Sequence, residues 1–474
     1  MRKIARVSRA AAAFMLTAAP SMWPAVAQMQ RQVHQCDNKD VSFDQRISGC
    51  TAAIRSGKWK GQDLAWAYLN RGVAWRAKGD NNRAIADYDR AIRLNPKLAL
   101  AYSNRGVAWS AMGDNGRAIA DYDRAIRLAP KYARAYNNRC DAYREQGHND
   151  QAIADCNEAI RLDPKLATAY NNRGSASRAK GDDGRAIADY DQAIRLDPKY
   201  ALAYNNRCDT YRDKGSSDQA MADCNEAIRL DPKLAVAYNN RGTVWRARGD
   251  NDRAIADFNQ AIRLDAKLAL AYNSRCYTYH IKGNNDQAVA DCNEAIRINP
   301  KFALAYNNRG IAWRAIGDND RATADYDQAI QLDAKLALAY YNRGNMYRDK
   351  NDYDHAIADY TQAIQLDPKF SSAYINRGVL HNEKGDYDRA IADYTRAIQL
   401  DPKLAVAYNN RGNAYSAKDD YSRAIADYTQ AIELDTKAAR SYYNRGLAKR
   451  AQGDTAAGDA DIAQARQIDP NIGK

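Results

Sequence analysis

The amino-acid sequence predicts an all-α protein built as an array of about twelve stacked helix-turn-helix units. A 34-residue phrase repeats from Ala65 to Ile472. Apolar residues within it recur at the spacing of a helix face, and turn residues recur at two fixed places. This period is typical of stacked supersecondary units rather than of separate globular cores. The units begin at Ala65, Ala99, Ala133, Ala167, Ala201, Ala235, Ala269, Ala303, Ala337, Ser371, Ala405 and Ala439.

Residues 1–27 differ from the array in charge and composition. The stretch MRKIARVSR has four basic residues and no acid, a short apolar stretch follows, and Ala25-Val26-Ala27 forms an A-x-A cleavage pattern. This order predicts a secretory signal peptide cleaved near Ala27, with a disordered or membrane-anchoring tail as the alternative. No later stretch reaches the roughly 20 apolar residues of a transmembrane helix. We therefore expect a periplasmic or secreted protein without a membrane span.

Each unit of the array predicts two helices separated by turns. Position 4 is tyrosine in all twelve units, as at Tyr68, and shares a helical face with positions 8 and 11. Positions 20, 24 and 27 form a second such face. Glycine at position 15 in ten of the twelve units, as at Gly79, predicts a left-handed end to the first helix. The pair Asp163-Pro164 and its equivalents predict an N-cap and a first-turn proline for the next unit.

The repeated pattern resembles the tetratricopeptide repeat family over about nine tenths of the mature chain. The matching residues of the first unit are Tyr68, Gly72, Trp75, Ala84, Tyr88, Ala91 and Pro96. The resemblance implies a right-handed superhelical solenoid with the first helices lining a concave channel. Together with the N-terminal pattern, the repeat gives three expected regions: a signal peptide at 1–27, a capping segment at 28–64 and twelve repeats at 65–472. The chain departs from the family pattern in carrying arginine at position 7 in place of leucine.

That arginine has a predicted partner in every unit. Position 7 is arginine from Arg71 to Arg445, and position 23 is aspartate from Asp87 to Asp461. An unpaired charge near a helix interface would cost several kcal/mol, whereas a hydrogen-bonded pair is tolerated. We predict a structural ion pair. The alternative is two solvated surface charges.

The eight cysteines occur as four pairs. In the third, fifth and seventh units they occupy positions 8 and 24, which the resemblance places on facing helices. In an oxidising compartment this predicts disulfides within those units and a fourth in the capping segment. The alternatives are reduced thiols filling the volume of glycine plus tyrosine, and a metal site, for which two cysteines fall short of the four ligands of zinc. The predicted pairs are Cys36 and Cys50, Cys140 and Cys156, Cys208 and Cys224, and Cys276 and Cys292.

The sequence predicts neither an enzyme nor a cofactor or metal site. Outside the signal peptide and the array only residues 28–64 remain, too few for an independent catalytic domain. The recurrent Gly-Asp pair is a helix cap rather than a phosphate-binding loop. The five histidines share no repeated acid or nucleophile: His34, His148, His280, His355 and His381.

Asparagine occupies position 6, which is expected to face the channel, in all units but the seventh. Carboxamides offer both a donor and an acceptor and so suit an extended peptide backbone. The family resemblance implies the same use; the alternative is that they bond only to the neighbouring helix. The candidate peptide-binding residues are Asn70, Asn104, Asn138, Asn172, Asn206, Asn240, Asn308, Asn342, Asn376, Asn410 and Asn444. Position 9 varies between units and would encode specificity.

Arginine at position 12 adds positive charge beside the channel in eight units. Removing the four signal-peptide charges from the formal net charge of +13 leaves +9 for the mature chain. Such an excess favours acidic partners. We therefore predict a scaffold that binds an extended, acidic protein or peptide segment. The alternative is a binder of anionic envelope polymers or lipid headgroups; nucleic acid is not expected for a secreted protein. The candidate anion-binding residues are Arg76, Arg144, Arg178, Arg212, Arg246, Arg314, Arg348 and Arg450.

Overall fold

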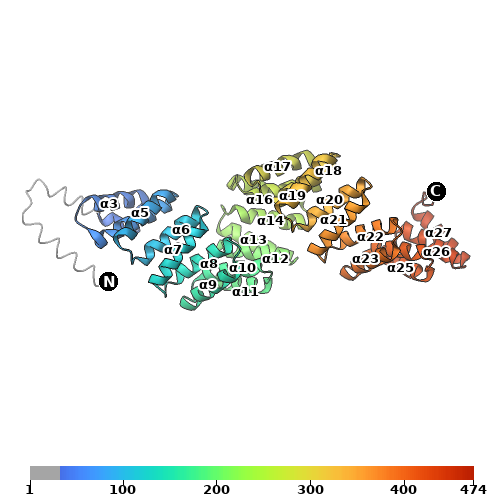
Figure 1. Ribbon diagram of the computed structural model, residues 1–474, viewed down its shortest axis with the longest axis horizontal. Helices are drawn as coiled ribbons and strands as arrows, with labels where there is room; N and C mark the ends of the chain where they lie inside the picture. Colours follow the sequence, from blue (N-terminus) through green and yellow to red (C-terminus); the bar gives the residue numbers. More distant parts are fainter. Residues whose placement is uncertain (1–32, 474) are drawn as a thin grey trace, which may run out of the picture. The chain divides into compact units, whose positions relative to one another are not determined.

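A computed structural model describes residues 33–473, so the predicted signal peptide lies outside the described residues. The described part contains helices and no strand (Figure 1). Two compact units divide the chain, residues 1–233 and 234–474, and each is described by itself. The order of elements within both units is a regular alternation of a first and a second helix, one pair per 34-residue repeat.

The first helices start at the residues that the repeat phase predicts. They are α4 (Ala65–Ala77), α6 (Ala99–Ala111), α8 (Ala133–Glu145), α10 (Ala167–Ala179), α12 (Ala201–Asp213), α14 (Ala235–Ala247), α16 (Ala269–Ile281), α18 (Ala303–Ile316), α20 (Ala337–Asp349), α22 (Ser371–Glu383), α24 (Ala405–Ala417) and α26 (Ala439–Ala451).

The second helices follow after a short turn. They are α5 (Asn81–Leu94), α7 (Asn115–Leu128), α9 (Asn149–Leu162), α11 (Asp183–Leu196), α13 (Ser217–Leu230), α15 (Asn251–Leu264), α17 (Asn285–Ile298), α19 (Asn319–Leu332), α21 (Tyr353–Leu366), α23 (Tyr387–Leu400), α25 (Tyr421–Leu434) and α27 (Thr455–Ile468).

Packing within each compact unit follows one rule. A first helix packs on the second helix of its own repeat, and that second helix packs on the next first helix. Successive first helices also contact each other, for example α8 with α10 and α16 with α18. No comparably close contact joins successive second helices in the described part of either unit. Because helices lie closer together on the inner side of a curved array, the first helices form its inner surface.

The turn between the two helices of a repeat depends on a left-handed residue at position 15. Gly79 has a φ of 83° there, where a side chain would be strained. In the ninth and eleventh repeats Asn351 and Asp419 take the same conformation, with φ of 60° and 58°. These are among the residue types that best tolerate it. The predicted left-handed end of the first helix is confirmed.

The predicted capping role of the Asp-Pro pair is wrong. Asp163 ends α9, and its Oδ1 accepts the backbone N–H of Lys165 at 3.1 Å. Leu166 is the residue before α10, and it makes no side-chain cap. The aspartate closes a tight turn two residues ahead, and the following proline keeps it out of the helix. The second helices do have aspartate caps, since Asp80 accepts the backbone N–H of Arg83 at 2.9 Å.

Distinct segments cover the two ends of the described chain. At the N-terminal end α3 (Phe43–Arg55), followed by the 3-10 helix η3 (Gly61–Leu64), packs on α4. The Thr51 hydroxyl of α3 accepts a hydrogen bond from Arg71 at 3.0 Å. At the C-terminal end the outer face of α27 is polar and exposed, with Asp459, Gln464 and Gln467 on it. A polar outer face is what the last repeat of an array needs for solubility.

Candidate functional site

The charged pair between the two helices of a repeat is present throughout the array. In the first repeat Arg71 Nε donates to Asp87 Oδ2 at 2.8 Å and Nη2 donates to Oδ1 at 2.7 Å. This bidentate geometry is the strongest that a guanidinium and a carboxylate form. All twelve repeats have the pair, so the predicted structural ion pair is confirmed.

The same arginine also ties neighbouring repeats together. Arg173 Nη1 donates to Asn157 of the preceding repeat at 2.8 Å, and Arg377 Nη1 donates to Thr361 at 2.9 Å. The guanidinium lies against the tyrosine one turn earlier on its own helix, 5.4 Å from the ring centre of Tyr170 for Arg173. Its donors are therefore used inside the protein, and we call this arrangement the arginine clamp. The clamp is part of the scaffold rather than of a ligand site.

The eight cysteines form four disulfides, as predicted. Cys140–Cys156, Cys208–Cys224 and Cys276–Cys292 join the two helices of a repeat, with Cα atoms 5.5, 5.4 and 5.5 Å apart. Cys36–Cys50 joins α3 to the helical residues before it, with Cα atoms 4.5 Å apart. All eight side chains are buried. Among the described residues no group of His, Cys, Asp or Glu has an arrangement that could hold a metal ion.

Packing explains why cysteine at position 8 always accompanies cysteine at position 24. In the other repeats except the twelfth, which has Ile462 at position 24, glycine at position 8 lies under an aromatic ring at position 24. A Cβ added to Gly310 would be 2.7 Å from Cε1 of Tyr326, closer than real atoms approach. A side chain larger than hydrogen therefore fits at position 8 only when the ring is absent. The paired change was visible in the sequence, but this steric reason was not.

The asparagines of position 6 form a ladder between successive first helices. Asn172 Nδ2 donates to Asn137 Oδ1 at 3.2 Å, and Asn206 Nδ2 donates to Asn171 Oδ1 at 3.0 Å. In five of the seven cases described below the acceptor is the position-5 asparagine of the preceding repeat, which the sequence analysis had not singled out; Asn70 donates to Asp37 of the cap, and Asn376 donates to the Tyr341 hydroxyl. At least seven of the eleven donate to the preceding repeat or cap in this way: Asn70, Asn172, Asn206, Asn308, Asn342, Asn376 and Asn444.

The ladder uses part of the hydrogen-bonding capacity of each carboxamide. A primary amide has two N–H donors and an oxygen with two lone pairs. Asn308 donates one N–H to Asn273 at 2.9 Å and accepts from Asn307 at 3.2 Å, and it is buried. None of the eleven predicted asparagines is exposed, and Asn240, Asn308 and Asn342 are buried. The ladder therefore supports stacking, and peptide binding by these side chains stays a prediction.

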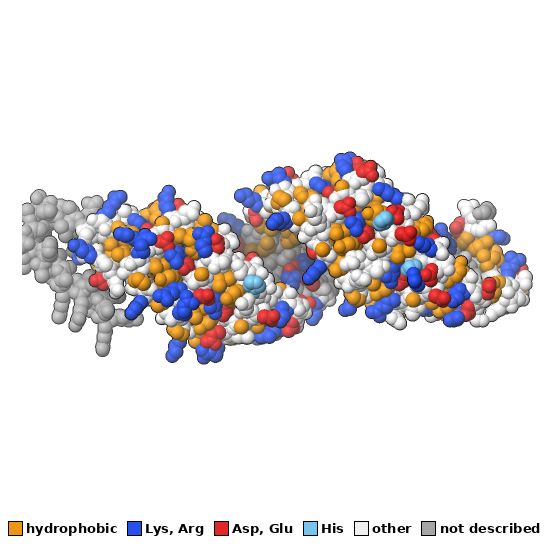
Figure 2. Space-filling model, viewed as in Figure 1, with side chains coloured by type: hydrophobic (Ala, Val, Ile, Leu, Met, Phe, Trp, Pro, Cys, Tyr) orange, Lys and Arg blue, Asp and Glu red, His pale blue; other side chains and the backbone are white. Residues whose placement is uncertain are grey.

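Most arginines of position 12 are neutralised by carboxylates of the same surface. Arg178 pairs with both Asp209 and Asp213 of the next first helix, and Arg212 pairs with the same two residues. Such pairing weakens the attraction of these arginines for an external anion. Acidic and basic side chains are interspersed on the face drawn in Figure 2. The remaining pairs are Arg144 with Asp141 and Glu145, Arg314 and Arg348 with Asp349, and Arg450 with Asp459.

Two arginines of this set make other contacts. Arg246 donates to the backbone oxygen of Ser274 at 3.2 Å, and its guanidinium lies 5.2 Å from the ring centre of Tyr277. Arg76 is half-buried and its Nε has no hydrogen-bond partner among residues 33–473. Burial raises the pKa of the neighbouring Tyr88 to about 12, although the charge of Arg76 opposes the rise.

Exposed large apolar side chains are concentrated on the first helices. Eleven such residues occur in the described chain, and nine of them lie within a first helix or at its C-terminal end. The nine are Leu100, Met112, Leu202, Leu270, Tyr277, Ile281, Ile316, Val406 and Leu447. The other two are Phe43 in α3 and Leu434 in α25. Contiguous exposed apolar patches mark surfaces that contact partners, so the first helices are the candidate surface.

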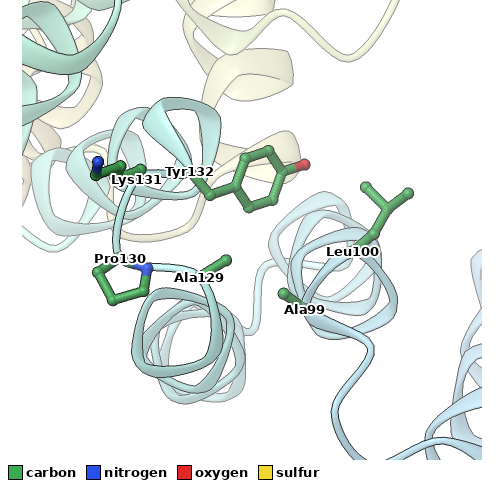
Figure 3. Close-up of a pocket in the computed structure, with 6 residues that line it drawn as sticks. All are labelled: Ala99, Leu100, Ala129, Pro130, Lys131 and Tyr132. Atoms are coloured by element: carbon green, nitrogen blue, oxygen red, sulfur yellow. The ribbon is translucent and has the colours of Figure 1, made fainter.

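An apolar pocket of about 670 Å³ lies between the start of α6 and the turn from α7 to α8. In Figure 3 the Tyr132 ring extends from the turn toward α6, where Leu100 lies, while Lys131 extends away from it. Ala129 replaces the aspartate or asparagine that every other repeat has at position 31. Without that polar side chain the floor of the pocket is apolar, with Ala99 and Pro130 as further lining residues.

Family models match most of the repeats. The chain belongs to the tetratricopeptide repeat family. Together the matched ranges cover more than half of the chain, and the family is generally a non-catalytic scaffold fold that mediates contacts between proteins. A tetratricopeptide repeat model matches residues 99–132, 337–370 and 405–436, two others of the same description match 359–392 and 209–269, and a TPR repeat model matches 72–113, 141–177, 174–207, 277–314 and 380–419.

Three solved structures align with the chain at low sequence identity. The APC/C hetero-tetramer Cut9-Hcn1 aligns with a TM-score of 0.54 and 15% identity, over 97% of this chain and 95% of that one. Yeast Tom70 aligns with a TM-score of 0.44 and 17% identity, over 86% and 97% of the two chains. A tetratricopeptide repeat protein from Parabacteroides merdae has a TM-score of 0.44 and 20% identity, over 52% and 98%. No curated protein matches the sequence. The family matches, the paired helices and the alignment with Cut9-Hcn1 confirm the expected all-α solenoid of tetratricopeptide repeats.

Two observations bear on where the protein works. Four buried disulfides fit an extracellular or periplasmic space, where cysteines are kept oxidised. In the described part of the chain, none of the helices has the length and apolar character needed to cross a bilayer.

Proposed function

We propose that this tetratricopeptide repeat protein is a scaffold that binds an extended segment of a protein partner along its first helices. The observation that carries the proposal is the position of the exposed apolar side chains, nine of eleven of which lie on or at the end of these helices. Burial of apolar surface is the main favourable term in protein association. The second helices, by contrast, expose almost none.

The asparagine ladder would fix the orientation and the register of the bound segment. Each carboxamide in the ladder keeps hydrogen-bonding capacity that its neighbours do not use, as at Asn308. A peptide backbone passing along the inner surface offers N–H and C=O groups at regular intervals to meet it. In this proposal the ladder first holds the helices in register and then binds the partner with its remaining groups.

Binding of anionic envelope polymers or lipid headgroups is the less favoured function. It would rely on the position-12 arginines, most of which already face carboxylates such as Asp209 and Asp349. Adding an anion there would require breaking these ion pairs or binding beside them. Peptide binding that persists at high salt, where exposed charge interactions are screened, would favour the protein-partner proposal.

We further propose that the protein acts in the periplasm or outside the cell. Residues 1–27 would be removed as a signal peptide, and residues 28–64, fixed by the Cys36–Cys50 disulfide, would cap the twelve repeats of residues 65–472. The signal-peptide pattern and the four disulfides support this assignment.

Site-specific photo-crosslinking tests the binding surface. A photoreactive residue at Val406 on α24 should crosslink a bound partner, whereas the same residue at Leu434 on α25 should not. The two side chains are a matched pair, since both are exposed aliphatic residues on the two helices of one repeat. Crosslinking from Leu434 but not from Val406 would contradict the proposal.

A second variant tests the ladder itself. Asn240→Ala combined with Asn308→Ala should weaken partner capture while leaving the helical circular dichroism spectrum unchanged. Unchanged capture by this folded double variant would restrict the asparagines to a stacking role.

A further inference from the structure

The positive charge of the chain is concentrated at its N-terminal end. Residues 28–132 include 18 basic and 10 acidic residues, whereas residues 133–474 include 49 basic and 48 acidic ones. The capping segment and the first two repeats therefore contribute +8 of the +9 expected for the mature chain, and the other ten repeats together are close to neutral. Such an asymmetry between two parts of a chain indicates an anionic partner for the basic part.

Two positions of the repeat account for much of this excess. Position 26 is Arg90 in the first repeat and Arg124 in the second, whereas nine of the ten later repeats have glutamate or glutamine there. Position 31 is Asn95 and Ala129 in the same two repeats, whereas nine of the ten later repeats have aspartate. Both positions lie near the C-terminal end of a second helix or in the turn after it. The first two repeats are therefore basic at one end.

The basic side chains at that end are exposed, and none of them forms an ion pair among residues 33–473. The neighbouring carboxylates of Asp89 and Asp123 pair instead with the clamp residues Arg105 and Arg139 of the next repeats. We call these exposed side chains the basic edge. It consists of Arg90, Arg93, Lys97, Arg124, Arg127 and Lys131.

Helix stability does not explain the arginines of the basic edge. Arg90 and Arg93 are three residues apart on α5, and like charges at this spacing repel each other. In the third repeat the same two positions are Glu158 and Arg161, which attract each other, with Arg161 Nε donating to Glu158 Oε2 at 2.7 Å. An external anion would relieve the repulsion on α5.

Aromatic and aliphatic side chains adjoin the basic edge. The apolar pocket between α6 and the turn from α7 to α8 has Lys131 on one side and Leu100 and the Tyr132 ring on the other (Figure 3). The capping segment has a similar combination in the turn after α3, where Lys58 Nζ lies 5.2 Å from the ring centre of Trp59. Basic residues beside Trp, Tyr and Leu are typical of surfaces that lie in the headgroup region of a bilayer.

We infer that the basic edge docks this protein on the surface of an anionic lipid bilayer. The arginines and lysines contact lipid phosphates, and Leu100 and Tyr132 contact the apolar boundary beneath the headgroups. A bilayer presents anionic groups over a wide area, so it reaches the equivalent side chains of both repeats at once. It also covers the apolar side chains, which an acidic polysaccharide would leave in water. The inference is independent of the proposed function, because the basic edge belongs to the second helices and the turns after them.

Flotation of the full mature chain with lipid vesicles tests the inference. The chain should bind vesicles of equal parts phosphatidylcholine and phosphatidylglycerol, and it should bind vesicles of phosphatidylcholine alone at least about tenfold more weakly. Raising the salt from about 0.05 M to about 0.5 M should release the protein, because salt screens exposed charges. Equal binding to the neutral vesicles would overturn the inference.

Two matched variants locate the docking surface. Each replaces four exposed arginines of second helices with glutamine, which later repeats have at the same positions, so both should keep the wild-type circular dichroism spectrum. The edge variant should bind the anionic vesicles at least about tenfold more weakly, whereas the control should bind them like the wild type. An equal loss in both would mean that net charge alone attracts the protein and would contradict the assignment. The edge variant is Arg90→Gln, Arg93→Gln, Arg124→Gln and Arg127→Gln. The control variant is Arg161→Gln, Arg195→Gln, Arg229→Gln and Arg263→Gln.

A fluorescent label tests the apolar contact. An environment-sensitive fluorophore on Leu100→Cys should shift its emission to the blue on vesicle binding, whereas the same label on Leu202→Cys, the equivalent position of the fifth repeat, should not. The eight native cysteines are all in disulfides, so the label reacts at the new one. The absence of a shift at Leu100 would rule out contact with the bilayer interior. Tighter binding of polyglutamate than of vesicles, lost in the edge variant, would assign the basic edge to an acidic protein segment instead. The Val406 crosslink decides the proposed function separately.

Discussion

The repeats with a cysteine pair and the repeats with a glycine–tyrosine pair fill the same space between two helices in different ways. In the eighth repeat the Tyr326 ring is buried over Gly310 and fills the space by volume. In the seventh repeat Cys276 and Cys292 occupy the same two positions and close the space with a covalent bond. The arginine clamp is present in both kinds, as Arg309–Asp325 and Arg275–Asp291. The interior of a repeat is therefore exchangeable as long as the clamp is kept.

Shifted pKa values occur in the clamp of both kinds of repeat. In the cysteine repeats burial raises the pKa of Asp223 and of Asp291, and the hydrogen bond from the arginine opposes this rise. In the second repeat the hydrogen bond to Asp121 raises the pKa of Arg105. The carboxylates are nevertheless equally buried in both kinds of repeat, since Asp223 and Asp291 are 6% and 7% exposed and Asp121 is 6% exposed.

Removing the arginine of the clamp should have the largest effect in both kinds of repeat. Arg207→Ala in the fifth repeat and Arg309→Ala in the eighth each leave a buried carboxylate unpaired, which costs about 3–5 kcal/mol. Urea denaturation of the two variants checks this. Because burial already raises the pKa of Asp223, the loss in Arg207→Ala should shrink as the pH falls below the pKa of that carboxyl. A loss below about 1 kcal/mol in either variant would contradict a shared role for the clamp.

Reduction of the disulfides should lower the local stability of the cysteine repeats and leave that of the tyrosine repeats unchanged. For two cysteines 16 residues apart, as in Cys276–Cys292, the lost loop constraint corresponds to about 3 kcal/mol. Hydrogen exchange should therefore speed up in α16 and α17 on reduction. The tyrosine repeat of α20 and α21 serves as the internal control and should change little. Equal acceleration in both would show that the disulfides stabilise the whole array rather than their own repeat.

A single methyl group should disturb a tyrosine repeat. Gly310→Ala places a Cβ 2.7 Å from the Tyr326 ring and should cost about 1–3 kcal/mol by overpacking. The double variant Gly310→Cys and Tyr326→Cys should instead form a new disulfide, recover stability under oxidising conditions and lose it on reduction. Thermal melting with and without a reductant measures both. Failure of the double variant to oxidise would show that more than two positions separate the kinds of repeat.

Alkaline pH should lower the stability of the tyrosine repeats, and this loss should be smaller than those of the preceding variants. Burial raises the pKa of Tyr88 and of Tyr360 to about 12, from an ordinary value near 10. An unfolded tyrosine loses its proton above pH 10 while the folded one keeps it, so stability is full below pH 10 and falls toward pH 12. Between pH 10 and 11 the loss is at most about 1.4 kcal/mol per tyrosine. Circular dichroism melts over this range should show it, and the double cysteine variant should show less.

The sequence was most informative where one rule is repeated many times. The helix phase, the left-handed turn at position 15 and the clamp all follow from residues that recur at fixed spacing, such as Arg71 and Asp87. It was least informative about turns and shared hydrogen bonds. Asp163 and the proline after it match the sequence pattern of a helix cap, but Asp163 closes the turn after α9. Backbone geometry beyond these two residues decides which backbone N–H donates to the Asp163 side chain.

The candidate binding surface was also predictable from the sequence only in part. From periodicity alone the sequence determined that first helices repeat a polar face bearing asparagine and arginine. The cysteine pairing followed only with the family resemblance, which places positions 8 and 24 on facing helices. Only the tertiary structure decided that Asn308 bonds to Asn273 of the preceding repeat and that Arg178 faces Asp209 and Asp213 of the next. These contacts join residues about one repeat apart, so they depend on how far one helix is displaced along its neighbour. That displacement is set by packing between repeats, which a pattern within one repeat does not contain.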